Sequence, residues 1–373
     1  MIDAPCPWGT GPFTLTEGYS SLYNEIAIMR AEPFACTWLD TRQDRTDKVV
    51  LTANTDHWNK ERGPNLERVV FHNDIPPAEA LNLVCDTEGE VDIVTEVSPA
   101  DAERVHNSEH ARLYAIDAMR VILGLVNRGV EDAPLDDART RRALNMALDR
   151  DRMVREGFGG YAYPAAGVTP PYALGGLSTL EPYPHDPEGA KRLLQEAGWP
   201  EGRALRLATQ AALEGVTNMF AEDLRNSLGI EVEVAVTPDE ELLAAQHALV
   251  EKVMPLPFDV LVFAWIDLTS DAPAAFMHGE LYGETGMFRV GPPVERFEAL
   301  MGEFAAEVDA GRQSELSAEI DRLAYDEALS VFLVYPQALY AVNKHVDFVG
   351  YATTFELAET RVTEDHWSRR NGS

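Results

Sequence analysis

A tryptophan followed by two aspartates is the part of this sequence best suited to bind a small molecule. An apolar run at residues 258–265 ends on Trp265, and Asp267 and Asp271 follow it. An indole face attracts a cation, and a carboxylate adds a charge-assisted hydrogen bond. The combination predicts a site for an amine or guanidinium group. The alternative is that the two aspartates only cap the loop and the helix that follows.

Three other side chains are candidates for the same site. Tyr161 and Tyr163 lie in a loop rich in glycine and proline at residues 159–171, where tyrosines either line a pocket or help the loop to pack. Arg128 follows an apolar strand at 120–127, and its guanidinium would meet a ligand carboxylate unless it is an ordinary surface arginine. The candidate ligand-binding residues are therefore Trp265, Asp267, Asp271, Tyr163, Tyr161 and Arg128.

The sequence carries no motif for catalysis. GxSxG, HExxH, a P-loop and a GxGxxG after a strand are all absent. His106 and His110 flank Glu109 at a spacing that chelates a metal when both histidines share a helix, but solvated surface histidines are the alternative and no third ligand is evident. His278 lies close to the tryptophan segment. We assign no catalytic residue, metal or cofactor, and the question of an enzymatic role stays open.

The charge of the chain argues against some partners. It has 62 acidic and 31 basic residues, a formal charge of −31. Such a surface repels phosphate backbones and anionic lipid, which disfavours nucleic-acid and membrane-surface roles. No run approaches ~18 apolar residues and no export signal is visible, so the chain as given is expected to be soluble. Cys6, Cys36 and Cys85 lack the spacing of a disulfide framework or a zinc site.

Signals for helix ends are densest at residues 136–200. Asp186 is expected to cap a helix that begins at Pro187, and apolar residues then repeat at i, i+3, i+4 and i+7 up to Ala197. Gly198 supplies the left-handed residue that ends this helix. Another helix is expected from Asp136 or Asp137.

The middle of the chain reads as an α/β layer. Strands expected at 205–209, 230–236 and 258–265 alternate with helices expected at 216–228 and 239–253. This spacing predicts a parallel sheet, and the nearly continuous apolar strand before Trp265 suits a central position covered on both faces. Ligands of open α/β sheets bind beyond the carboxyl ends of the strands, which is where Trp265 and Asp267 lie.

The flanking regions mix strands and helices. In the first third, strands are expected at 49–53, 68–72 and 91–97, with a helix at 77–86 that makes the last two strands a β–α–β unit. After the middle region, helices at 294–310 and 313–329 precede a returning pair of strands at 331–335 and 339–342.

Six segments stand out by their order and spacing: GTGPF at 9–13, TDHW at 55–58 before LERVVF, GEVDIV at 89–94, RRALNMALDR at 141–150, YPHDPEGAKRLLQEAGWP at 183–200 and FDVLVFAWIDLTSDAP at 258–273. Together they resemble the large periplasmic solute-binding proteins of peptide, nickel and opine ABC importers, called family 5. The resemblance implies an α/β, two-lobed, periplasmic-binding-protein-like (type II) fold with a hinge. It also implies that the loop at 159–171 borders the cleft.

The same resemblance implies a domain plan. Lobe I would take residues 1–140, lobe II residues 141–325, and residues 326–373 would return to lobe I. Family members carry a domain-sized portion before GTGPF, so an N-terminal subdomain is expected to be missing here. The segment at about 19–45 reads as an insertion, and it or a partner chain is expected to cover the sheet edge that the missing strand would leave open.

One departure concerns the ligand. In peptide-binding relatives an aspartate three residues after the tryptophan holds the ligand's amino terminus. Here that position is Leu268, and Asp267 stands one place early. The match to a site for an α-amino group is therefore incomplete.

The sequence predicts a protein that encloses a small polar or peptide-like ligand and, by its resemblance, delivers it to an ABC importer permease. The alternatives are a cytoplasmic enzyme or biosynthetic accessory protein on the same scaffold, and a module that pairs as a homodimer through the truncated lobe I. The resemblance implies a periplasmic or extracellular location, whereas a true start at Met1 would imply the cytoplasm.

Overall fold

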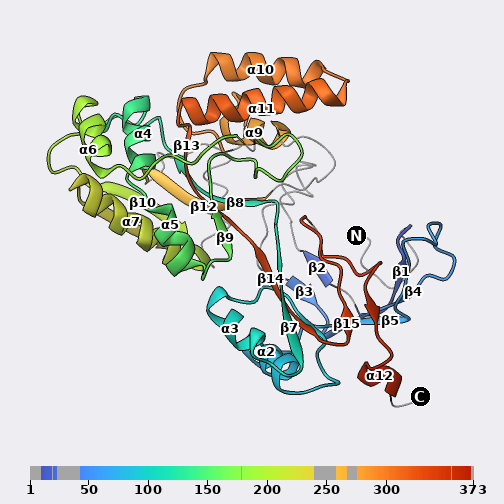
Figure 1. Cartoon of the computed structure of the whole chain (residues 1–373). Coiled ribbons are helices and arrows are strands. Elements are labelled where there is room, and N and C mark those ends of the chain that lie inside the picture. Colours follow the sequence, from blue (N-terminus) through green and yellow to red (C-terminus); the bar gives the residue numbers. More distant parts are fainter. Residues whose placement is uncertain are drawn as a thin grey trace. The chain divides into compact units, whose positions relative to one another are not determined.

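The computed structural model divides the chain into two compact units (Figure 1). Unit 1 comprises Met1–Ile116 and Ala338–Ser373, and unit 2 comprises Asp117–Gln337. The structure describes residues 10–18, 20–22, 43–177, 179–238, 258–266, 275–286, 288–353 and 355–370. The chain thus crosses between the units at 116/117 and 337/338, whereas the sequence placed the boundaries near 140 and 325. The reason is that the strand at 120–126 already belongs to the sheet of unit 2 and the strand at 330–336 still belongs to it.

A six-stranded sheet forms the centre of unit 2. Its strands, in spatial order, are β11 (Val232–Thr237), β10 (Leu205–Gln210), β12 (Val260–Ile266), β8 (Arg120–Val126), β13 (Ser330–Pro336) and β9 (Ala162–Pro164). β10 runs parallel to β11 and β12, while β8 is antiparallel to β12 and β13. The predicted parallel strands, and the inner position of the strand that contains Trp265, are confirmed.

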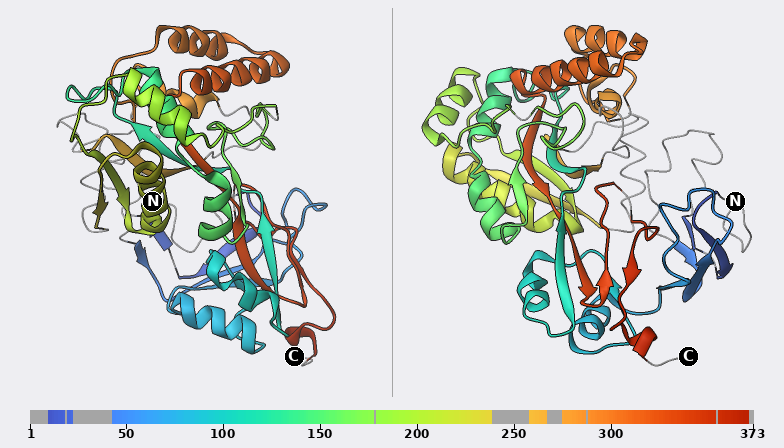
Figure 2. Two further views of the ribbon diagram at one scale, coloured as in Figure 1. Left: turned by 60° about the vertical axis from the view of Figure 1, so that its left-hand side comes forward. Right: turned by 45° about the vertical axis from the view of Figure 1, so that its right-hand side comes forward.

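Helices cover both faces of this sheet (Figure 2). One face carries α4 (Ala138–Met146), α6 (Pro187–Glu196) and α7 (Glu214–Leu228), and there Leu144 and Phe220 share a core with Val262. The other group contains α9 (Ala275–Tyr282), α10 (Glu295–Ala306) and α11 (Ala310–Asp326). The Tyr282 hydroxyl lies 2.7 Å from Ser330 Oγ of β13, which ties α9 to the sheet. Two covered faces explain why β12 is apolar along its length.

The helix ends of unit 2 form where their capping residues predict. Asp186 accepts a hydrogen bond from Gly189 N at 2.9 Å, and α6 begins at the following proline. Asp137 caps α4 in the same way. Gly198 and Gly229 have φ of 78° and 70°, a left-handed conformation that glycine adopts without strain. The short α5 (Arg150–Arg152) and a π-helical turn (Met153–Gly157) follow α4.

Unit 1 consists of several small sheets. They are β1 (Phe13–Glu17), β4 (Lys48–Ala53) and β5 (Arg68–His72); β6 (Ile93–Val94), β14 (Ala338–Asn343) and β7 (Ala111–Ile116); β2 (Ser20–Leu22) with β3 (Gln43–Arg45); and β15 (Val346–Asp347) with β16 (Arg361–Val362). Its helices are α2 (Pro77–Asp86), α3 (Ala102–His106) and α12 (Trp367–Arg370), with a 3₁₀ turn at Pro99–Asp101. Tyr340, Val342 and Phe348 form a core on which residues of both three-stranded sheets pack.

One sequence prediction about strand pairing is wrong. β5 and β6 flank α2 as expected, but β5 pairs with β4 whereas β6 pairs antiparallel with β14, so no β–α–β unit forms. The partner of β6 comes from a distant part of the chain, which a local pattern does not reveal. The two strands expected at 331–335 and 339–342 are confirmed as β13 and β14, and the chain passes from unit 2 to unit 1 between them.

Other predictions fall partly outside the described residues. In the segment at 19–45, β2 pairs with β3, and the residues between these strands lie outside the described part of the chain. The covering of a sheet edge by this segment stays a prediction. The helix expected at 239–253 also lies outside the described residues.

A buried carboxylate joins the amino ends of β10 and β12. Asp259 has no exposed surface, accepts a hydrogen bond from Arg206 N at 2.7 Å, and pairs with the guanidinium groups of Arg203 and Arg206 at 2.9 and 2.8 Å. Burial alone would raise the pKa of Asp259, but the bonds from the two arginines outweigh it and hold the pKa below the ordinary value of 3.8.

Replacing Asp259 with Asn is expected to lower the free energy of unfolding by about 3 kcal/mol, because Arg203 and Arg206 would keep charges that lose their main counter-ion. Urea denaturation at neutral pH measures this. Since the folded pKa is depressed, the stabilisation is complete above the unfolded-state pKa and is lost as the pH falls through the folded value, so wild type and variant should converge in strong acid. The control is Asp132→Asn, whose carboxylate is 63% exposed and also contacts Arg203. An equal loss of unfolding free energy in both variants would contradict the role of Asp259 as the main counter-ion of the two arginines.

Candidate functional site

The carboxyl ends of four strands meet at one edge of the unit 2 sheet. β13 runs in the same direction as β10, β11 and β12, because β12 and β13 are both antiparallel to β8. The last residues of these strands therefore line this edge, which we call the carboxyl edge: Gln210, Thr237, Ile266 and Pro336. The chain crosses between the units at Asp117, three residues before β8 begins, and at Gln337, directly after β13, so both crossings lie at the same edge.

Trp265 lies at the carboxyl edge within an aromatic group. In the ladder between β12 and β8 it lies opposite Val121. Its ring centroid is 5.0 Å from that of Phe288 and 6.0 Å from that of Phe263. The residue is 9% exposed, and its Nε1–H has no hydrogen-bond partner among the residues that the structure describes. A buried donor without an acceptor costs about 1–3 kcal/mol. Trp265 thus offers a donor at this edge, while little of its ring faces solvent.

Tyr161 and Tyr163 reach the same edge through β9. Tyr163 pairs with Tyr335, and the backbone N–H of Gln337 donates to the Tyr161 carbonyl at 3.0 Å. Tyr163 is 43% exposed, and its ring packs edge-on against Tyr172 at 6.3 Å. Partial burial, followed by the nearby Asp117 carboxylate, raises the pKa of Tyr163, so its hydroxyl stays protonated at neutral pH.

Arg120 is a residue of this edge that the sequence analysis missed. It is the first residue of β8 and pairs with Ile266 in the β8–β12 ladder. Its half-buried guanidinium forms no hydrogen bond or ion pair within the described part of the chain. An unpaired guanidinium is a bidentate partner for a carboxylate. The available signal was its position at the start of an apolar strand, but no motif marks it.

Arg128 lies at the opposite end of β8. It is 8% exposed, donates to Asp136 Oδ1 at 3.3 Å, and donates to the carbonyl of Pro292. Burial lowers the pKa of Arg128. The alternative of an ordinary surface arginine is wrong, because Arg128 is buried. The two chain crossings lie at the other end of β8. The structure therefore brings Trp265, Tyr161 and Tyr163 to one edge and keeps Arg128 away from it.

The remaining candidates do not add to this edge. Asp267 and Asp271 lie outside the described residues, so their role stays a prediction. The expectation that His106 and His110 share a helix is wrong, because α3 ends at His106. His278 is buried, with Nε2 2.8 Å from Asp321 Oδ1. Within the described ranges, no three His, Cys, Asp or Glu side chains are grouped so as to hold a metal ion.

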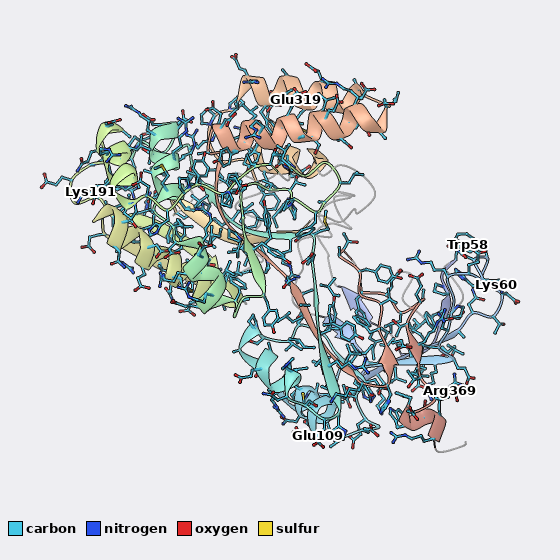
Figure 3. All side chains as sticks on the ribbon, viewed as in Figure 1. Trp58, Lys60, Glu109, Lys191, Glu319 and Arg369 are labelled. Carbon is cyan, nitrogen blue, oxygen red and sulfur yellow. The ribbon has the colours of Figure 1, made fainter. Side chains whose placement is uncertain are left out.

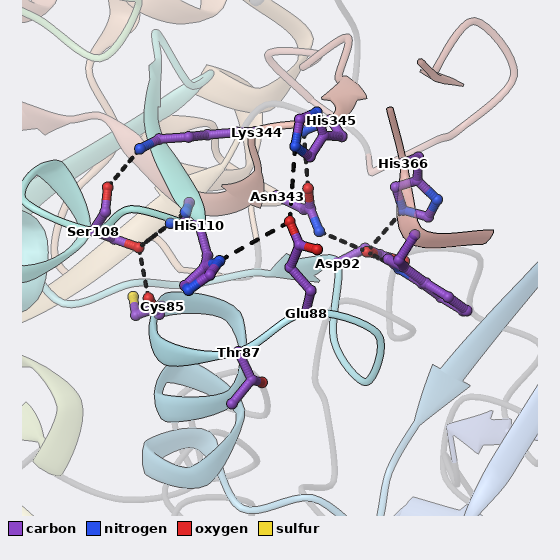
Figure 4. Close-up of polar contacts among 12 residues, drawn as sticks. Cys85, Thr87, Glu88, Asp92, Ser108, His110, Asn343, Lys344, His345 and His366 are labelled. Carbon is purple, nitrogen blue, oxygen red and sulfur yellow. Dashed lines mark hydrogen bonds and ion pairs between the residues drawn. The ribbon is translucent and has the colours of Figure 1, made fainter. Parts of the chain in front are cut away.

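A separate polar cluster in unit 1 surrounds Glu88 (Figure 4). The carboxylate accepts a hydrogen bond from Arg370 of α12, and this bond holds the pKa of Glu88 below its usual range. His345 Nε2 and His110 Nδ1 lie 3.7 and 4.0 Å from Glu88 Oε1. Four residues along the chain, Asp92 Oδ1 accepts a hydrogen bond from Trp367 Nε1 at 2.9 Å. The cluster fastens α12 to the segment after α2, which is a structural role.

A family model described as "Bacterial extracellular solute-binding proteins, family 5 Middle" matches residues 6–285, which is more than half of the chain. The chain belongs to this family. The family predicted from the segments quoted above is thereby confirmed.

Two curated relatives align with about half of the chain. The glutathione-binding protein GsiB of Escherichia coli (strain K12) is 28% identical over 196 residues, and GsiB of Salmonella typhimurium is 27% identical over 196 residues. Each alignment covers 52% of this chain and 32% of the relative. The alignment thus spans about a third of the length of these curated relatives.

Solved structures of family 5 type share the fold. The substrate-binding protein CtaP of Listeria monocytogenes has a TM-score of 0.74 at 19% identity, over 95% of this chain and 67% of that chain. NikA of Brucella suis, in complex with Fe(III)-EDTA, has a TM-score of 0.72 at 19% identity, over 95% and 68%. The predicted α/β fold of type II binding proteins is therefore confirmed. No helix in the described part of the chain is long and apolar enough to cross a membrane.

The unpaired N–H of Trp265 has a spectroscopic signature. In protein labelled with ¹⁵N-tryptophan, the indole proton of Trp265 is expected upfield of those of Trp199 and Trp367, because the latter two donate to Arg203 O at 3.1 Å and Asp92 Oδ1 at 2.9 Å. Single Trp→Phe variants assign the three resonances. A Trp265 resonance as far downfield as the other two would show that its N–H is already bonded.

Proposed function

We propose that the carboxyl edge of unit 2 binds a small polar or peptide-like solute. The observation that carries the proposal is the Trp265 Nε1–H, which is buried and has no acceptor among the described residues. Arg120 adds an unpaired cation at the same edge. Membership in family 5 supports solute binding as the role of this site.

The chemistry of the edge favours a ligand with acceptor groups. Trp265 and Arg120 both donate hydrogen bonds, so a carboxylate or a peptide carbonyl is their natural partner. Tyr161 and Tyr163 would flank the ligand with ring surface and hydroxyl groups. Asp267 and Asp271 follow β12 in the sequence, and a ligand amino group is the partner that their carboxylates would take. A zwitterion such as a short peptide would offer a carboxylate to the two donors and an amino group to the two aspartates.

Relatives guide the choice of the first ligands to test. GsiB is named as a glutathione-binding protein, DppA of Helicobacter pylori was solved with the peptide STSA, and AgaA was solved with agropinic acid. All three ligands carry carboxylates, in keeping with donors at the edge. We take glutathione as the first probe because its binding protein aligns with half of this chain.

The wider role follows from the family. The protein would work outside the cytoplasm, in the periplasm or at the cell surface, and pass its ligand to the permease of an ABC importer. Native mass spectra of the protein would also report whether the chain pairs as a homodimer. A cytoplasmic enzyme or biosynthetic accessory protein is not favoured, because the matched family and its relatives are solute-binding proteins.

Native mass spectrometry of freshly purified protein is the first test. A bound species of small-molecule mass is expected, because a tightly bound ligand dissociates slowly enough to remain on the protein through purification. Unfolding and dialysis remove the bound ligand, and the protein is then refolded. Isothermal titration calorimetry of the refolded protein should detect binding of glutathione or of a tripeptide from a panel. Protein that carries no ligand and binds neither glutathione nor any tripeptide would contradict the proposal.

Two variants separate the roles within the site. Trp265→Phe and Arg120→Gln are each expected to weaken binding of the restoring ligand by about tenfold or more, the effect of losing one hydrogen bond to a charged group. The matched control is Arg155→Gln, an exposed arginine of unit 2 that pairs only with its neighbour Glu156 in the described residues. Circular dichroism checks that all three proteins fold. Equal affinities in all of them would remove the carboxyl edge as the binding site.

A further inference from the structure

The two chain crossings are tied to each other by side chains of unit 2. Gln337 Nε2 donates to Asp117 Oδ1 at 2.8 Å and to the Tyr163 hydroxyl at 3.3 Å. Asp117 is the first residue of unit 2 and Gln337 is the last, so this amide joins the points where the chain enters and leaves the unit. We call Asp117, Gln337 and Tyr163 the crossing clasp.

The loop that begins at β9 reinforces the clasp. The Gln337 N–H donates to the Tyr161 carbonyl at 3.0 Å, and the Tyr172 hydroxyl donates to the carbonyl of Ala118 at 2.7 Å. The same loop therefore holds the exit of the chain through Tyr161 and its entry through Tyr172. The edge-on contact between Tyr163 and Tyr172 links these two attachments.

Hydrogen bonds of this kind restrain the backbone at the crossings. A hinge works when a few residues at the ends of elements absorb a change in φ and ψ. Asp117 and Gln337 occupy such positions, because Asp117 directly follows β7 and Gln337 directly follows β13. Turning either crossing moves one end of the Gln337–Asp117 bond, and a bond to a carboxylate is stronger than one between neutral groups. The two crossings are thus held to move together.

We propose that the crossing clasp is the positioning device of the hinge: it couples the two crossings and limits the range of arrangements that the units adopt. This inference rests on the two-unit fold and extends the proposed function by naming residues that act on closure rather than on the ligand. Tyr163 lies in both, since its hydroxyl belongs to the clasp and its exposed ring belongs to the carboxyl edge.

The decisive variant is Gln337→Met, which keeps the length of the side chain and the backbone N–H but removes both amide donors. Spin labels at Glu109→Cys in unit 1 and Lys191→Cys in unit 2, in a background without the native cysteines, report the distance between the units. Both positions are exposed, and Figure 3 shows their side chains. Double electron–electron resonance is recorded on refolded, ligand-free protein.

Gln337→Met is expected to shift the ratio of the populated distances by about tenfold, or to broaden a single population, as loss of one hydrogen bond to a charged group would. Tyr163→Phe removes the longer bond to the Gln337 amide but keeps the bond from Gln337 to Asp117, so it should shift the ratio less. The matched control is Gln313→Met on α11, which removes the bond from its amide to the Glu307 carbonyl at 2.8 Å, away from the crossings.

The readout separates a positioning role from a merely structural one. A structural role would lower the melting temperature and leave the distances unchanged, whereas the clasp predicts changed distances with both units folded. Identical distance distributions for wild type, Gln337→Met and Gln313→Met would overturn the proposal. Because the measurement uses ligand-free protein, its result is independent of whether glutathione or a tripeptide binds, so the two proposals fail separately.

Discussion

The antiparallel pairing of β8 on both of its sides is the constraint on which the rest of unit 2 depends. β8 lies between β12 and β13, and its direction places Arg120 beside the end of β12. If β8 ran parallel to its neighbours, the entry of the chain would lie at the other edge of the sheet, away from Trp265. One reversed strand therefore gathers both crossings and the candidate ligand residues at a single edge.

The interior satisfies most of its polar groups, which makes the exception at this edge informative. Arg150 is buried without a carboxylate partner, yet it donates to the carbonyls of Phe332, Asn145 and Tyr183. Of the buried side-chain atoms that lack a partner in the described residues, Trp265 Nε1 is the one nitrogen; the others are hydroxyl or carboxylate oxygens. An indole N–H only donates, so a ligand acceptor is the simplest way to offset its desolvation.

Local sequence patterns predicted the elements well and their partners less well. The helix at 77–86 and the cap at Asp186 follow from residues within a few positions, so periodicity and capping chemistry reveal them. The pairing of β6 with β14 joins strands about two-thirds of the chain apart, and no local pattern encodes it. The same limit applies to the candidate site. Trp265 could be predicted because it ends an apolar strand, whereas the positions of Arg120 and Gln337 at the carboxyl edge depend on the direction of β8, which no local pattern encodes.

The chemistry of the edge also refines the ligand that the sequence suggested. The sequence predicted a site for an amine, because the carboxylates that follow β12 accept hydrogen bonds. The described residues of the edge instead supply hydrogen-bond donors, Trp265 Nε1 and Arg120. The formal charge of −31 does not oppose a ligand carboxylate there, because charges farther than about 8 Å are largely screened at physiological salt. A short-range site decides affinity, while the distant surface charge decides which large anions approach at all. A small zwitterion can bind the donors of the site and is not repelled by the surface charge, whereas a polyanion is repelled before it reaches the site.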